Sequence, residues 1–127
     1  MANSERRQRG LEVMKKVYAG DVPVPPEGTL DFADIMLEQL FAEVWSREAL
    51  SIRDRRMLLL GAIAALGEKD VFRIQARAAL KNDELSPEQL REVVIHMVQY
   101  AGYPRVSGLV AVVESEIAEL ESQAAAR

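Results

Sequence analysis

The fold class is indicated most clearly by residues 86–104, which read SPEQLREVVIHMVQYAGYP. Ser86, with Gln89 three residues later, forms the pattern of a helix N-terminus closed by a capping box. Gly102 and Pro104 are typical of a helix end. The apolar residues between these signals recur at helical spacing, at Leu90, Val93, Val94, Met97, Val98 and Ala101. The stretch therefore predicts one amphipathic helix that ends near residue 102.

Helical patterns also cover the rest of the chain, and none of it shows the alternation of a β-strand. The predicted helices span about residues 4–18, 30–45, 51–66, 69–81, 86–101 and 105 onwards. The second helix is expected to bury an apolar stripe of Ile35, Met36, Leu40, Phe41 and Val44. Three prolines in residues 21–28 forbid a helix there and predict an extended surface strap, or else a mobile lid. We expect an all-α, single-domain bundle of about six helices over residues 1–127, with a ragged tail from about 121 to 127.

One predicted helix has an unusually apolar second half, because residues 57–66 read MLLLGAIAAL. A helix that is apolar on every side needs burial all round, which a small domain cannot easily supply alone. We therefore expect this helix to pack against another subunit of a homo-oligomer.

Composition excludes several classes of function. A net charge of −4 argues against a nucleic-acid-binding surface, and we read the basic cluster at residues 53–56 as a solvated or interface face. The absence of Cys excludes disulfides, thiolate metal sites and thiol peroxidase chemistry, and one His cannot build a multi-histidine metal site. The N-terminal residues lack the apolar stretch of a secretory signal, and no apolar run approaches the roughly 20 residues that span a bilayer. The expected location is the cytoplasm, with no membrane partner.

Three segments together resemble the carboxymuconolactone decarboxylase family. They are residues 9–13 (RGLEV), residues 43–47 (EVWSR) followed by Leu50, Arg53 and Arg55, and residues 90–104 (LREVVIHMVQYAGYP). The resemblance implies the alkylhydroperoxidase-like all-helical fold and assembly as a trimer or hexamer. It also implies a lyase that needs no cofactor and acts on 4-carboxymuconolactone in the 3-oxoadipate pathway of aromatic catabolism.

The chain departs from the pattern of this family in two places. Redox relatives carry a Cys-x-x-Cys pair before a histidine, and the corresponding positions here are Glu68, Val71 and Gln75. Decarboxylase relatives usually keep a histidine at the position of Gln75, and a glycine often stands where this chain has residues 83–85 (DEL). An alternative is therefore a catalytically diverged oligomer that binds a small ligand or has a structural role. An alkylhydroperoxidase-like antioxidant protein is disfavoured because the chain has no Cys.

The acid/base candidate is His96, the only side chain of this chain with an ordinary pKa near neutrality. Glu92, His96 and Tyr100 are spaced four residues apart, so they share one flank of the predicted helix. Glu92 could orient the imidazole as a proton carrier, and Tyr100 could contact the substrate. The alternative is a structural hydrogen bond of His96 at a subunit interface.

Glu43 and Trp45 belong to the second segment of the resemblance. Glu43 could act as an acid, a base or an orienting carboxylate near the apolar surface of Trp45. Trp45 itself could contact the substrate. The alternatives are an exposed ion pair between Glu43 and Arg47, four residues later, and simple core packing of Trp45.

Arg53 and Arg55 could anchor a dicarboxylate substrate, because a guanidinium group binds carboxylate bidentately. The alternative is an inter-subunit salt bridge or a solvated face, which we favour for Arg53 and leave open for Arg55. Gln75 can donate a hydrogen bond to an oxyanion but cannot transfer a proton. A catalytic role for Gln75 would thus be that of an oxyanion donor.

Overall fold

The computed structural model describes the backbone of residues 4–126 and the side chains of residues 5–126. Every regular element in that range is a helix, which confirms the all-α prediction. Contacts group the chain into two compact helical units, Met1–Ile52 and Arg53–Arg127. Within residues 4–126, none of the helices has the length and apolar character needed to cross a bilayer.

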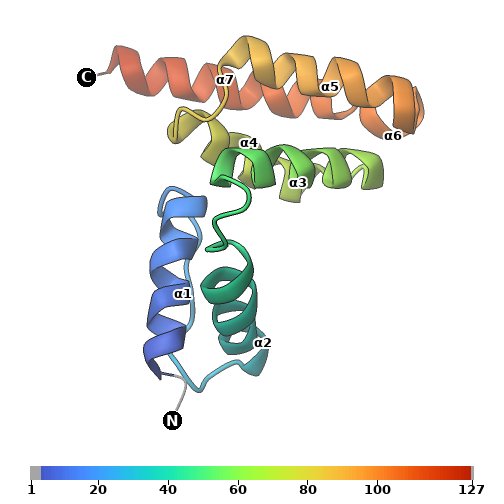
Figure 1. The fold of residues 1–127 in the computed structure, drawn as a ribbon. Coiled ribbons are helices and arrows are strands. Elements are labelled where there is room, and N and C mark those ends of the chain that lie inside the picture. Colours follow the sequence, from blue (N-terminus) through green and yellow to red (C-terminus); the bar gives the residue numbers. More distant parts are fainter. Residues whose placement is uncertain (1–3, 127) are drawn as a thin grey trace. The chain divides into compact units, whose positions relative to one another are not determined.

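In the first unit, helix α1 (Ser4–Val17) packs against a second helical rod (Figure 1). This rod starts as α2 (Asp31–Ile35) and continues as the π-helix η1 (Met36–Val44). The wider winding shows in the bond from the Trp45 N–H to the carbonyl of Leu40, five residues earlier, at 2.9 Å. The buried apolar residues of this unit are Met14, Val17, Ala33, Leu37, Phe41 and Trp45.

The apolar stripe predicted for residues 30–45 is wrong in part. Ile35, Leu40 and Val44 are exposed, whereas the buried residues of the rod are Ala33, Leu37, Phe41 and Trp45, each four residues apart. The predicted stripe assumed α-helical winding throughout. Because the π-helical part winds more widely, residues four apart stay on the side that faces α1.

A close backbone approach between α1 and η1 explains a glycine in the first segment of the resemblance. A Cβ atom on Gly10 would lie 1.9 Å from the carbonyl oxygen of Leu37. Only glycine lets the two helices pack at this distance.

The proline-rich segment is hydrogen-bonded to the helices of its own unit. Buried Arg7 of α1 donates to the carbonyl of Pro25 at 2.8 Å and forms an ion pair with Asp34 of α2, also at 2.8 Å. The other carboxylate oxygen of Asp34 accepts from the Gly28 N–H at 3.0 Å. These bonds are those expected of an ordered strap.

The second unit contains most of α3 (Ile52–Leu66) together with α4 (Lys69–Lys81), α5 (Pro87–Ala101), α6 (Tyr103–Val106) and α7 (Leu109–Ala125). The predicted capping box of α5 is confirmed, since Ser86 and Gln89 form both of its hydrogen bonds. The helix predicted from residue 105 onwards is instead divided at Ser107 and Gly108, both weaker helix formers than alanine. α7 continues to Ala125, through most of the expected ragged tail.

The core of the second unit lies between α3, α4, α5 and α7, and α7 packs against both α4 and α5 (Figure 1). α3 contributes Leu60, Ile63 and Ala64 to it. Leu58 and Leu66 on the other side of α3 remain 66% and 65% exposed. The chain itself therefore does not bury α3 all round, and its packing against another subunit stays a prediction.

Candidate active site

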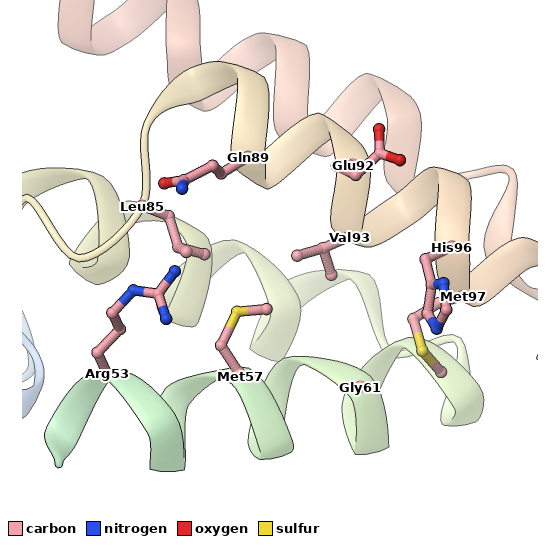
Figure 2. Close-up of a pocket in the computed structure, with 9 residues that line it drawn as sticks. All are labelled: Arg53, Met57, Gly61, Leu85, Gln89, Glu92, Val93, His96 and Met97. Atoms are coloured by element: carbon pink, nitrogen blue, oxygen red, sulfur yellow. The ribbon is translucent and has the colours of Figure 1, made fainter.

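A pocket of about 370 Å³ lies between α3, α5 and the turn that precedes α5, within the second unit (Figure 2). Its lining residues are Arg53, Met57, Gly61, Leu85, Gln89, Glu92, Val93, His96 and Met97. The size is that of a site for a small organic molecule.

The polar groups of this pocket are separated along its length (Figure 2). Arg53 of α3 and Gln89 of α5 lie at the end next to Leu85, and His96 lies at the other end beside Met97. The wall between them is supplied by Met57, Gly61 and Val93. The remaining polar lining residue, Glu92, points its carboxylate away from α3. The pocket thus offers a cationic end, an apolar middle and an imidazole end.

Arg53 is held at its end of the pocket by the turn between α4 and α5. Its Nε donates to the backbone carbonyl of Glu84 at 2.9 Å, and its Nη1 lies 4.0 Å from a carboxylate oxygen of Asp54. The side chain is 45% exposed, so its remaining donors can reach a ligand from solvent. Sequence reasoning favoured a salt bridge or a solvated face for Arg53, whereas the structure places it at the pocket.

A buried polar network supports the same turn. Arg56, with a fully buried side chain, forms an ion pair with Glu84, with Nε to Oε1 at 2.9 Å and Nη2 to Oε2 at 3.3 Å. Its Nη1 also donates to the amide oxygen of Gln75. Because buried charges need paired partners, this network fixes Glu84 and hence the carbonyl that Arg53 contacts.

Sequence reasoning missed the role of Arg56, which it assigned to a solvated or interface face. A signal was present in the spacing, because Arg56 lies four residues before the core residue Leu60 and is in phase with Ile63 and Ala64. A charged residue on a core-facing stripe indicates a buried ion pair.

Gln75 does not line the pocket. It is 2% exposed, and its amide oxygen accepts from Arg56 inside the unit. The structure therefore gives Gln75 a supporting contact and does not bring it together with His96 in the pocket. In residues 83–85, where relatives often carry a glycine, Asp83 adopts the positive φ of 54° that glycine favours.

His96 projects from the exposed side of α5, and its ring lies 5.1 Å from that of Tyr100, centroid to centroid. The anticipated pairing with Glu92 is not formed: within residues 5–126 no hydrogen bond or ion pair links these two side chains. The Glu92 carboxylate points away from α3 in Figure 2. Tyr100 is 79% exposed and touches His96 without lining the pocket.

The remaining candidates lie elsewhere. Glu43 and Trp45 belong to the first unit, where Glu43 pairs with Arg6 at 2.9 Å and the Trp45 ring stacks on Phe41 with centroids 6.3 Å apart. Core packing is thus the observed role of Trp45. Arg55 is half-buried at the start of α3 and is not among the pocket-lining residues.

Comparison with known proteins confirms the family resemblance. A family model for the carboxymuconolactone decarboxylase family matches residues 31–115, from α2 into α7. The chain belongs to the carboxymuconolactone decarboxylase family. Among curated proteins it is similar to 4-carboxymuconolactone decarboxylase of Acinetobacter baylyi, with 30% identity over 110 residues, which cover 82% of this chain and 81% of that protein. The pocket of Arg53 and His96 lies within the part of the chain that the family model covers.

Proposed function

We propose that this carboxymuconolactone decarboxylase family member is a carboxy-lyase that acts on a small lactone carboxylate, with 4-carboxymuconolactone of aromatic catabolism as its substrate. The observation that carries the proposal is the pocket between α3 and α5, where Arg53 and His96 stand at opposite ends of an apolar wall. A lactone carboxylate has the matching order of groups: an anionic end, an apolar ring and a carbon that must receive a proton.

The reaction needs no cofactor as an electron sink, because the lactone carbonyl of the substrate accepts the electron pair. When the bond to the leaving carboxylate breaks, CO2 departs and the electron pair spreads through the ring double bond onto the lactone carbonyl oxygen. A proton then returns to the ring carbon next to that carbonyl and gives the enol-lactone. The protein must hold the retained carboxylate, stabilise the developing charge and deliver this proton.

His96 is the proton donor in this proposal, and Arg53 is the carboxylate anchor. His96 is the only histidine of the chain and lies at the pocket end away from Arg53. Arg53 is chosen over Arg55 as the anchor because it lines the pocket and the Glu84 carbonyl directs its guanidinium group. Gln75 supports the site from the core through Arg56.

We also propose that the chain self-associates, as a trimer or hexamer. The support is the apolar surface that the second unit leaves uncovered on α3, at Leu58 and Leu66. Burial of such surface in a partner is favourable at about 25 cal/mol per Å². Sedimentation velocity tests this: a monomer at micromolar concentration contradicts it.

The test of function is release of CO2 from 4-carboxymuconolactone by the purified protein and two variants. We expect turnover by the unaltered chain and a loss in kcat of about a hundredfold or more in His96→Gln, as for removal of a general acid. Arg53→Gln should act mainly on KM, by roughly tenfold to a hundredfold, because a charge-assisted contact to the carboxylate is lost.

Arg91→Gln is the matched control for Arg53→Gln. Arg91 also lies in the second unit and pairs with a carboxylate, Glu114, but it does not line this pocket. Its loss should leave both constants unchanged. If the unaltered chain releases no CO2, the proposed lyase activity is wrong, and a diverged ligand-binding role takes its place.

A further inference from the structure

We propose that Gln89 is a substrate-binding residue, whose side-chain N–H group joins Arg53 in holding the retained carboxylate of the substrate. The proposal rests on the proposed function for the identity of the substrate. It adds a second donor, and with it a defined orientation of the ligand in the pocket.

The capping box of α5 fixes which end of the Gln89 amide faces the ligand. The Ser86 N–H donates to Oε1 of Gln89 at 2.9 Å, and the Gln89 N–H donates to Oγ of Ser86 at 3.1 Å. A reversed amide would place an N–H group against the Ser86 N–H, so the observed orientation is the stable one. The amide NH₂ is then the end available to a ligand, and no protein group within residues 5–126 accepts from it.

The two donors are set by one short segment of chain. Glu84 supplies the carbonyl that holds Arg53, and Ser86, two residues later, supplies the capping contact that orients Gln89. Leu85, 3% exposed, anchors this segment in the core between them. Arg53 and Gln89 therefore lie at the same end of the pocket, each hydrogen-bonded to this one turn (Figure 2).

This end of the pocket is suited to an anionic acceptor. Guanidinium groups only donate hydrogen bonds, and the amide oxygen of Gln89 is turned to the Ser86 N–H. Two negatively charged carboxylates lie nearby. Asp54 is 4.0 Å from Arg53, and the Glu92 carboxylate points away from α3. Arg53 and Gln89 both have hydrogen-bond donors to offer at this end of the pocket, and a carboxylate with two oxygens can accept from both.

Arg53 and Gln89 together form a carboxylate clamp, which sets the direction in which the substrate lies. With its retained carboxylate at Arg53 and Gln89, the lactone ring rests on Met57, Gly61 and Val93. The carbon that receives the proton is then directed toward His96 at the far end. A lactone without this carboxylate would bind in no preferred direction.

Gln89→Glu separates the binding role from the capping role. Glutamate is the other residue that closes a capping box, so its carboxylate can still accept from the Ser86 N–H and the helix start is kept. The donor, however, is replaced by a negatively charged oxygen that repels a carboxylate. Gln99→Glu adds the same charge to the same helix outside the pocket and serves as the control.

Two quantities are measured. The first is KM for 4-carboxymuconolactone. The second is the affinity for adipate, a dicarboxylate with an apolar middle, whose binding is followed by the NMR signals of the single imidazole. Gln89→Glu should raise KM and lower the affinity for adipate by roughly tenfold or more, with unchanged thermal stability. Gln99→Glu should change neither quantity. Adipate binding that depends on Gln89 supports the clamp even if no CO2 is released, in which case only the proposed reaction fails. Turnover that is insensitive to Gln89→Glu, or no adipate binding by the unaltered chain, overturns the clamp.

Discussion

Loss of the Glu84 carboxylate should strongly destabilise the second unit. In the structure Glu84 neutralises Arg56, whose side chain is fully buried, and the Glu84 side chain itself is only 8% exposed. Glu84→Ala leaves the guanidinium group buried beside the neutral amide oxygen of Gln75 and removes the carboxylate that balances its charge.

The size of the effect follows from burial. Removing one partner of a buried ion pair costs about 3–5 kcal/mol, because the other charge remains in a medium that solvates it poorly. Glu84→Gln keeps an acceptor but loses the charge, and we expect a smaller loss of roughly 1–3 kcal/mol. Removing both charges, in Arg56→Met with Glu84→Leu, should be less harmful than Glu84→Ala alone.

The assay is urea unfolding followed by far-ultraviolet circular dichroism at one fixed protein concentration. Glu114→Ala is the matched control, because the Arg91–Glu114 pair has the same 2.9 Å Nε–O distance but both side chains are about half exposed. This control should leave the unfolding midpoint nearly unchanged. The reasoning is refuted if Glu84→Ala shifts the midpoint no more than Glu114→Ala does.

Three further predictions follow from single contacts. Gly10→Ala should lower the free energy of unfolding by about 1–3 kcal/mol, because the added Cβ overpacks against the Leu37 carbonyl. Urea unfolding followed by the fluorescence of Trp45, the only tryptophan and a residue of the same unit, measures this loss. An unchanged urea midpoint contradicts the close approach. Gly61→Ala should stabilise α3 by about 0.5–1 kcal/mol, because alanine is the better helix former and its Cβ would meet Met97 Sδ at an ordinary 3.7 Å. The same Cβ should raise KM, because it narrows the pocket. Burial raises the pKa of Glu116, but hydrogen bonds from Arg77 and Arg73 outweigh it and hold that pKa below its ordinary 4.5. Because the folded-state pKa of Glu116 is depressed, its contribution to stability is present above pH 4.5 and is lost as the pH falls through the lower folded value. In Glu116→Gln, the urea midpoint should therefore decline less steeply in acid than in the unaltered chain.

Local sequence signals were sufficient for most helix boundaries. The helix predicted over residues 69–81 coincides with α4, and the pattern from Ser86 to Gln89 located the start of α5 together with its capping bonds. Such signals act within one turn of chain, so they can be read without knowing the tertiary fold.

Features that depend on tertiary packing were not accessible in the same way. The π-helical winding of η1 moves Leu37 and Trp45 to the buried side and Leu40 and Val44 to the exposed side, which no α-helical pattern can anticipate. The composition of residues 53–56 also hid the difference between Arg56, which is buried, and Arg53, which lines the pocket.

The candidate site was foreseen only in part. His96 was found because it is the only histidine of the chain, and it does line the pocket. Gln75 and Arg55 were proposed from the family resemblance and lie outside the pocket, while Gln89 was noticed only as a cap. Its second role became visible when the structure placed it beside Arg53.

Binding of a lactone carboxylate between Arg53 and His96 can be observed directly at the imidazole. Because His96 is the only histidine, the two carbon-bound ring protons of its imidazole give NMR signals that report this one position. Titration with 4-carboxymuconolactone, or with its enol-lactone product if turnover is fast, should shift these signals saturably, and Arg53→Gln should weaken the response. Signals that stay fixed while the protein converts the substrate would place the active site elsewhere and rule out binding between Arg53 and His96.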